Sequence, residues 1–328
     1  MKSQRIHLTV LAALAYVAVI CLLRAPALAA EGSFERTLQV SGPVNLEVET
    51  GSGNIELRTG GSNQVQVKAY IKINEWLGGN NGEEKVKRLE ANPPIQQSGN
   101  DIRIGHVDDP ELRRNVLISY ELVVPANTQL RSRTGSGNQD VGGIHGPAEV
   151  ASGSGSLKIS GIDESVRADA GSGNIEIDHI NGSVHARSGS GTIHAIEIAG
   201  GFDAATGSGN VSLEQTAPGS VHVDTGSGGL DLHGIQGSLE AKAGSGNIHA
   251  DGNPTGGWTV HSGSGTIKLR FPSTAAFDLS AHTSSGSITV NHPLTVQGST
   301  GRKEIHGKVL AGGVPVEVET GSGNIEIE

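Results

Sequence analysis

The chain has 328 residues, a formal net charge of −10, and a composition that is 35% apolar but only 3% aromatic. A negative charge without clusters of Lys and Arg disfavours nucleic acid and anionic lipid as partners, and so few aromatic residues disfavour a surface that stacks on bases. The 49 glycines are about twice the average usage, yet apolar residues recur regularly, which excludes collagen and disordered chains.

Residues 1–30 are predicted to form a secretory signal peptide. Lys2 and Arg5 supply positive charge, residues 8–23 are almost wholly apolar, and Ala-Leu-Ala at 27–29 offers small residues for cleavage. The apolar run is shorter than the ~20 residues of a membrane-spanning helix, which makes an uncleaved anchor the lesser alternative. We therefore expect an exported protein of the periplasm, the cell surface or the extracellular space, with no integral membrane segment after signal removal.

The only cysteine, Cys21, lies inside that apolar run. Once the signal is removed the chain has no thiol, so we expect neither disulfides, nor thiolate catalysis, nor cysteine–metal sites. Stability must then come from backbone hydrogen bonds and apolar packing.

The strongest pattern is a repeat of the tripeptide Gly-Ser-Gly. From residue 135 onward the steps are 18, 18, 18, 18, 19, 18, 19 and 21 residues, counting a degenerate Ser-Ser-Gly copy at 284. A period near 18 is typical of a solenoid in which each repeat forms one rung. The intact copies begin at 51, 135, 153, 171, 189, 207, 226, 244, 263 and 321.

Apolar residues alternate within each repeat, which predicts half-buried strands. Two strands per repeat predict two parallel sheets that face each other, with equivalent side chains stacked ~4.8 Å apart. One inward column is predicted to hold Leu157, Ile175, Ile193, Val211, Leu230, Ile248, Ile267 and Ile288. The second is predicted to hold Val166, Val184, Phe202, Val221, Leu239, Trp258 and Phe277.

The tripeptides are predicted to form the sharp corners of the solenoid, where glycine would supply positive φ at the lowest steric cost. The residue before each tripeptide is nearly always Ser, Thr or Ala, and we interpret its small side chain as a fit to a narrow corner. Asn follows the tripeptide at 54, 138, 174, 210, 247 and 324, where it tolerates turn geometry and can bond along the stack.

Residues 31–134 differ from the regular repeats at 135–328. One rung at 44–58 is followed by 84 residues before the next tripeptide, and this stretch contains a predicted helix at 83–91 with Val86 and Leu89 on one side. The segments 63–73, 95–107 and 115–125 are predicted strands. We expect this insertion to cover the first end of the coil, because an uncovered rung would expose apolar core and unpaired backbone.

The run VLISYELVVPANTQLRSRTGSGN at 116–138, followed by eighteen-residue rungs, resembles the bacterial β-strand-repeat adhesin family, a domain family of unknown function, and the head domains of autotransporter adhesins. The resemblance implies a right-handed parallel β-helix and export. The chain is therefore predicted to be all-β: a signal peptide at 1–30, N-terminal strands with a first rung and a capping insertion at 31–134, and β-solenoid repeats at 135–328.

The last residues, VEVETGSGNIEIE at 316–328, nearly repeat LEVETGSGNIELR at 46–58. The chain is predicted to stop in the middle of a rung at Glu328. Ile325 and Ile327 would then offer an open pairing edge, which the charges of Glu326 and Glu328 would discourage from growing. End-to-end self-association is a hypothesis that follows from this edge.

Two outward columns of mixed charge are the places where chemistry would be expected. Neighbours of opposite charge ~5 Å apart stabilise a sheet surface modestly, so we interpret both columns as solvated ladders, with metal binding and catalysis as the alternatives. The first holds Arg167, His185, Asp203, His222 and Glu240, and the second holds Lys158, Glu176, His194, Ser212, Asp231, His249 and Lys268.

The thirteen histidines do not form a recognisable metal motif. His185 and His222 share a column but lie two rungs apart, nearly 10 Å, which is too far for one zinc ion. The serines of the corner tripeptides lack a positioned histidine and are interpreted as turn residues. We predict no catalytic, cofactor-binding or metal-binding residue.

Aromatic residues that could stack on sugars are scarce. Phe202, Trp258 and Phe277 fall on inward columns, and Trp76, beside Gly78-Gly79, is the one aromatic that could be exposed. Packing of Trp76 onto the first rung is the alternative.

The sequence therefore predicts an exported, non-catalytic β-solenoid that binds an unknown protein or glycan of the envelope or extracellular matrix. A glycan-active β-helix enzyme and a structural spacer or envelope-stress-associated protein are the alternatives. An enzyme would need carboxylates that converge in one groove.

Overall fold

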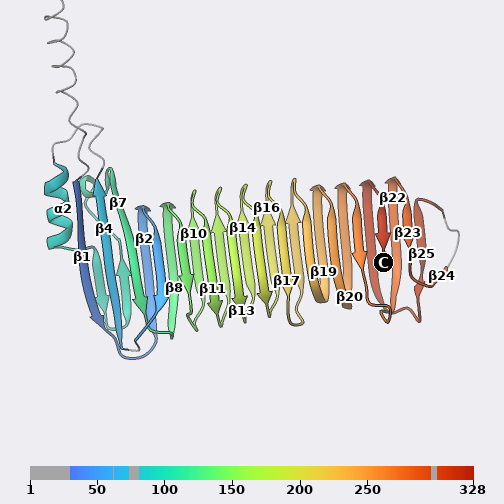
Figure 1. The fold of residues 1–328 in the computed structure, drawn as a ribbon, viewed down its shortest axis with the longest axis horizontal. Coiled ribbons are helices and arrows are strands. Elements are labelled where there is room, and N and C mark those ends of the chain that lie inside the picture. Colours follow the sequence, from blue (N-terminus) through green and yellow to red (C-terminus); the bar gives the residue numbers. More distant parts are fainter. Residues whose placement is uncertain (1–29, 62, 74–80, 297–300) are drawn as a thin grey trace, which may run out of the picture.

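Alternation of side chains builds two walls around a shared core. On residues 166–170, Val166, Ala168 and Ala170 are buried whereas Arg167 and Asp169 point outward, and this pattern recurs along the stack. The computed structural model describes residues 30–61, 63–73, 81–296 and 301–328, in which the strands form an elongated two-walled parallel β-solenoid (Figure 1). The predicted fold class is confirmed.

Some predictions fall outside the described residues. These are the signal peptide, apart from Ala30, and the position of Trp76. The division at residue 134 between a capping region and the repeats stays a prediction.

Wall 1 and wall 2 are each defined by the order in which their strands pair. Wall 1 runs through β5 (Ile95–Ser98), β6 (Asp101–Ile104), β2 (Val44–Ser52), β8 (Thr128–Ser136), β10 (Ala148–Ser152), β12 (Val166–Ala170), β14 (Val184–Ser188), β16 (Phe202–Thr206), β18 (Val221–Thr225), the second halves of β19 (Leu230–Ser245) and β20 (Ile248–Ser264), then β26 (Val314–Ser322), β22 (Phe277–Ser285), β25 (Glu304–Val309) and β24 (Leu294–Val296). Wall 2 runs through β1 (Ala30–Gln39), β4 (Gln64–Ile73), β7 (Val116–Val124), β3 (Ile55–Thr59), β9 (Gln139–Gly142), β11 (Leu157–Ile162), β13 (Ile175–Ile180), β15 (Ile193–Ile198), β17 (Val211–Gln215), the first halves of β19 and β20, then β21 (Ile267–Arg270), β27 (Ile325–Ile327) and β23 (Ile288–Val290).

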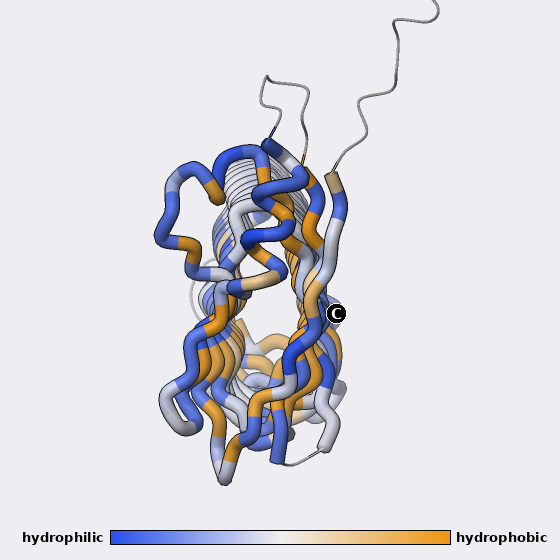
Figure 2. Tube along the Cα trace, turned by 90° about the vertical axis from the view of Figure 1, so that its left-hand side faces the viewer, coloured by the Kyte–Doolittle hydropathy of each residue, from blue (hydrophilic) through white to orange (hydrophobic). Residues whose placement is uncertain are grey.

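The inward columns are confirmed over most of their length. Leu157 pairs with Ile175, which pairs with Ile193, and the same register continues from Val211 to Ile267. These side chains are at most 2% exposed. Viewed along the stack, the apolar residues follow the two walls as continuous stripes (Figure 2). Equivalent residues of successive repeats therefore lie directly over one another.

Both predicted columns are wrong at their C-terminal ends. Ile267 and Ile288 do not pair with each other, because Ile325 lies between them and pairs with both. In wall 1 the neighbour of Trp258 is Val316, and Phe277 pairs with Val314, two residues out of line. The cause is that the last repeat in the sequence occupies an internal position in the stack.

The first end of the coil is covered as predicted. The helix α2 (Gly82–Ala91) buries Val86 and Leu89 and packs on β1 and β4, the antiparallel strands that close wall 2 (Figure 1). The predicted strands at 63–73 and 115–125 correspond to β4 and β7. The segment 95–107 is instead an antiparallel hairpin of β5 and β6 that turns at Gly99, whose φ is +63°. A short helix, α3 (Pro110–Arg113), follows it.

The open edge predicted at Ile325 and Ile327 is wrong. β27 pairs in parallel with β21 on one side and with β23 on the other, and both isoleucines are 0% exposed. The far end of wall 1 is formed instead by β24 and β25, which pair antiparallel beside β22. The last residues of the sequence are therefore covered on both sides.

Close approach, and not positive φ, explains the glycines of the repeated corners. In the body of the coil, Gly153 and Gly155 do not adopt left-handed φ values. A Cβ built at Gly155 would overlap the carbonyl oxygen of Gly137 one rung earlier, and a Cβ at Gly153 would overlap that of Gly135. The predicted reason is thus corrected: the stacked corners leave no room for a side chain.

The Ser and Thr residues before the tripeptides form hydrogen bonds, in addition to having side chains small enough for the corner. The Ser188 hydroxyl donates to the carbonyl of Gly173 in the preceding rung at 3.0 Å and accepts from the Gly191 amide at 2.8 Å. Ser152 and Thr206 make the same pair of bonds. These hydroxyls join successive corners and satisfy buried backbone groups.

The asparagines form the predicted ladder along the stack. Asn138 Oδ1 accepts from the Ser156 amide at 2.9 Å, and Asn174 Oδ1 accepts from the Thr192 amide at 3.0 Å. The partner in each case is the backbone of the next rung.

The opposite corner has a left-handed residue in three successive rungs. Gly161 (φ +62°), His179 (φ +54°) and Glu197 (φ +53°) occupy equivalent positions in successive rungs. His179 Nε2 contacts Glu197 Oε2 at 2.7 Å and His179 Nδ1 contacts Asp178 Oδ1 at 2.6 Å. The two non-glycine residues, His179 and Glu197, thus contact each other along the stack. The left-handed backbone conformation costs each of them about 1 kcal/mol.

The corner packing predicts a sharp contrast within one tripeptide. Gly155→Ala should destabilise the protein by about 1–3 kcal/mol, because the new methyl group overlaps backbone that cannot move away freely. Ser154→Ala, at the exposed middle position, should change stability by less than about 0.5 kcal/mol. Urea unfolding followed by circular dichroism measures both, and equal midpoints for the two variants would contradict the close-approach explanation.

Candidate functional site

The outer face of wall 1 carries a file of alternating charges. The predicted neighbours Arg167, His185, Asp203, His222 and Glu240 are in register on successive strands. The file also continues in the other direction from Arg167 through residues that the sequence prediction did not include. They are Glu149, Arg131, Glu47 and Arg103.

A groove lies over the first part of this file. It has a volume of about 1000 Å³ and is lined by residues of β5, β6, β2, β8, β10, β12 and β14. The hairpin residues Gln96 and Gln97 line it together with the charged file from Arg103 to His185. Polar side chains of Asn45, Gln129 and Ser165 complete much of the lining, which contains no Phe, Trp or Tyr. The groove therefore offers closely spaced hydrogen-bond donors and acceptors.

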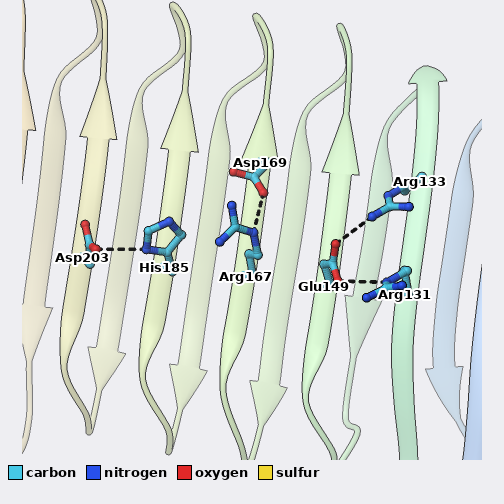
Figure 3. Close-up of polar contacts among 7 residues, drawn as sticks. All are labelled: Arg131, Arg133, Glu149, Arg167, Asp169, His185 and Asp203. Atoms are coloured by element: carbon cyan, nitrogen blue, oxygen red, sulfur yellow. Dashed lines mark hydrogen bonds and ion pairs between the residues drawn. The ribbon is translucent and has the colours of Figure 1, made fainter.

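Glu149 is held between two arginines in this file (Figure 3). Its Oε2 accepts from Arg131 Nε and its Oε1 from Arg133 Nη2, each at 2.9 Å. Partial burial alone would raise the pKa of Glu149, but the hydrogen bonds and charges of the two arginines outweigh it and lower that pKa below its usual range. The carboxylate thus stays charged and fixes both guanidinium groups.

The neighbouring pairs leave some hydrogen-bonding capacity unused. Arg167 Nε donates to Asp169 Oδ2 at 2.9 Å on the same strand, and His185 Nδ1 lies 3.1 Å from Asp203 Oδ2 on the next (Figure 3). His185 Nε2 is buried and has no hydrogen-bond partner among the described residues. His185 is therefore positioned by Asp203 at the end of the groove.

Wall 2 carries the second predicted column, and its register is confirmed. Lys158 and Glu176 lie 3.8 Å apart, a looser contact than those around Glu149. On the same wall, His233 lies between Asp231 and Asp251, at 3.1 Å and 2.5 Å. The hydrogen bond to Asp251 is the main reason why the pKa of His233 is raised. Among neighbours in the predicted column, Lys158 and Glu176 are the one ion pair in the described part of the chain, and the contacts of His233 lie beside the column.

The predicted spacing of the histidines is confirmed. His185 and His222 are separated by Asp203 on the intervening strand. Within the described ranges, no three His, Cys, Asp or Glu side chains are grouped so that they could hold a metal ion.

The aromatic residues of the repeats belong to the core. Phe202, Trp258 and Phe277 are at most 2% exposed, as their inward positions predicted. Phe271, which the sequence analysis missed, joins them: its ring centroid lies 5.0 Å from that of Trp258 and 4.6 Å from that of Phe277. Phe271 directly follows the end of β21. The alternation of inward and outward residues within a strand therefore does not predict its position.

The helices of the described ranges do not include one long and apolar enough to cross a membrane.

The stacked walls, hydroxyl-joined corners and outward charged file define a repeat-built β-solenoid. Residues 197–328 match the family model described as Toastrack DUF4097, which confirms for this part of the chain the predicted resemblance to a β-strand-repeat family of unknown function. No curated protein matches the chain.

Similar solved structures include two from bacteria. One is "a putative cell adhesion protein" from Clostridium sporogenes, with 13% identity over 90% of this chain and 99% of that chain, at a TM-score of 0.21. The other is "a putative adhesin" from Bacteroides fragilis, with 12% identity over 90% of this chain and 97% of that chain, at a TM-score of 0.26.

The pairing of Glu149 predicts a pH-dependent contribution to stability. Because its pKa is lowered in the folded protein, the contribution is fully present above the unfolded value of about 4.5 and is lost as the pH falls through the folded value. Glu149→Gln should therefore destabilise the protein at pH 7 by up to about 1 kcal/mol, since the carboxylate is partly exposed, and should cost progressively less as the pH is lowered below 4.5.

Urea unfolding of both proteins at pH 7 and at successively lower pH measures this difference. Glu176→Gln, from the looser pair on wall 2, is the matched control and should have a smaller effect at pH 7. A Glu149→Gln cost that does not change with pH would contradict the assigned role of the charge.

Proposed function

We propose that the protein is an exported, non-catalytic binding solenoid of adhesin-like character, and that the wall 1 groove binds a linear glycan of the envelope or the extracellular matrix. The observation that carries this proposal is the groove itself: about 1000 Å³ in volume and lined by side chains that recur from strand to strand.

The chemistry of the lining favours a polymer with little net charge. Arginines and carboxylates alternate between neighbouring strands from Arg103 to Arg167, so a polyanion or a polycation would meet as much repulsion as attraction. Because the strands are ~4.8 Å apart, a ligand lying across them would meet a guanidinium group and a carboxylate in turn. A chain of sugar rings, each with several hydroxyl groups, can use both.

The backbone of the groove favours a glycan over an extended peptide. The strands β2, β8, β10 and β12 are each paired on both sides. Their amides and carbonyls are therefore already bonded and cannot add a peptide strand. Recognition over these four strands has to use side chains, which suits a ligand with many hydroxyl groups.

Export is part of the proposal because of the N-terminal segment. Lys2, Arg5, the apolar run at 8–23 and Ala-Leu-Ala at 27–29 have the order of a cleavable signal. A purified envelope fraction is expected to contain the chain without these residues, and N-terminal sequencing of that product checks the cleavage site.

The binding proposal is tested with linear glycans prepared from the host envelope. Isothermal titration should detect binding to at least one uncharged or zwitterionic glycan. Arg131→Met and Arg167→Met should each weaken it by about tenfold or more, since a hydrogen bond to a charged group contributes about 1.5–3 kcal/mol. Lys158→Met, the matched change on wall 2, should leave the affinity unchanged.

Two other outcomes would favour the alternative functions. Release of shortened glycan during the titration, abolished by one carboxylate substitution in the groove, would identify an enzyme. Absence of binding to every glycan and envelope protein tested would favour a structural spacer. Equal losses for Lys158→Met and Arg131→Met would place the ligand away from the groove.

A further inference from the structure

Residues 314–328, here called the last module, fill a slot between two other rungs. β26 lies between β20 and β22 and is parallel to both, and β27 lies between β21 and β23 in the same way. In chain order, β22 and β23 follow β20 and β21, but in space they lie one rung further along the stack. After β25 the chain returns, and β26 and β27 occupy the rung between them (Figure 1). All strand pairing of the last module is with earlier segments of the chain.

Residues 44–59, the first module, occupy an equivalent place at the other end. β2 lies between β6 and β8, and β3 lies between β7 and β9, all in parallel. The first and last modules also have nearly the same sequence over 46–58 and 316–328. The protein therefore contains two similar slots, each filled by a similar module.

Charge at the equivalent positions Arg58 and Glu328 distinguishes the two slots. Arg58 hydrogen-bonds to Asp140 of β9, whereas Glu328 lies 2.8 Å from Lys268 and 3.6 Å from Arg270. A last module in the first slot would place Glu328 beside Asp140. A first module in the last slot would place Arg58 beside Lys268 and Arg270, so each exchange of place brings like charges together.

The outward face of the last module matches its own slot in charge. Glu319 is in register with His261 on one side and with His282 on the other, and it lies 3.6 Å from His261. Glu326 lies 3.7 Å from Lys268. The slot thus recognises the module by backbone pairing on two sides, by two inward isoleucines and by charge.

We propose that the last module is exchanged between copies of this chain, so that residues 314–328 of one copy fill the slot of a second. The contacts in the exchanged form are those of the closed form, so that exchange costs little at equilibrium. A slot left empty would expose apolar core and two sets of unpaired strand groups, which favours its filling by an equivalent module. This association is distinct from the growth at an open edge that Ile325 and Ile327 do not offer.

The exchange is tested with two single-cysteine proteins in a Cys21→Ser background, since Cys21 is the only native cysteine. Thr259 and Glu317 are exposed partners across β20 and β26, at the ~4.8 Å strand spacing that a disulfide spans. Thr259→Cys and Glu317→Cys proteins are unfolded, mixed, refolded together and oxidised. Exchange should produce a disulfide-linked heterodimer on a non-reducing gel.

Controls separate exchange from collision and from misfolding. Thr259→Cys mixed with Glu176→Cys, which lies on wall 2, gives the collision level. A chain carrying both Thr259→Cys and Glu317→Cys should form the internal disulfide, which verifies the register. His261→Cys and Glu319→Cys form a second partner pair and replace the first if either protein fails to refold.

The charge of Glu328 allows a second test, in which the heterodimer yield is measured after that charge is reversed. Glu328→Arg in the Glu317→Cys protein should remove most of the heterodimer, because the introduced guanidinium would face Lys268 and Arg270. Glu317→Cys with Glu214→Arg, an exposed position on β17 away from the slot, should keep the yield. A heterodimer yield no greater than that of the collision control would overturn the proposal.

Discussion

The close stacking of successive corners is the constraint on which the rest of the structure depends. Each Gly-Ser-Gly corner lies so near the previous one that a Cβ at Gly155 or Gly173 would overlap backbone. The hydroxyls of residues such as Ser188 donate across this short gap, and the side-chain oxygens of the asparagines accept from backbone amides across it. Because the corners hold the strands in regular succession, the buried side chains of both walls stack in columns.

The same succession creates the charged face of wall 1. An outward residue meets its equivalents one strand away, so that alternating charges along the file form pairs such as Arg131 with Glu149. The partly buried carboxylate of Glu149 fixes two arginines beside the groove. A solenoid of this kind can therefore present a long and repetitive polar surface, which is the physical basis of the proposed glycan binding.

The two ends of the stack are built by insertion and not by simple addition of rungs. The first and last modules each lie between two parallel neighbours. Beyond them, antiparallel strands end both walls at the first end of the stack and wall 1 at the far end, whereas wall 2 ends there in the parallel strand β23. The same design gives each slot its own charge pattern at Arg58 or Glu328.

The sequence by itself determined the rung period, the two walls, the inward columns from Leu157 to Ile267 and the outward file from Arg167 to Glu240, because these depend on local alternation and a constant repeat. Only the tertiary structure decided the place of the last module, the extension of the file to Arg103 and the groove that the β5–β6 hairpin helps to line. These features join segments that are distant in sequence. A periodic pattern predicts which residues face outward, but it does not predict which strands become neighbours when the spatial order of the rungs differs from their order in the chain.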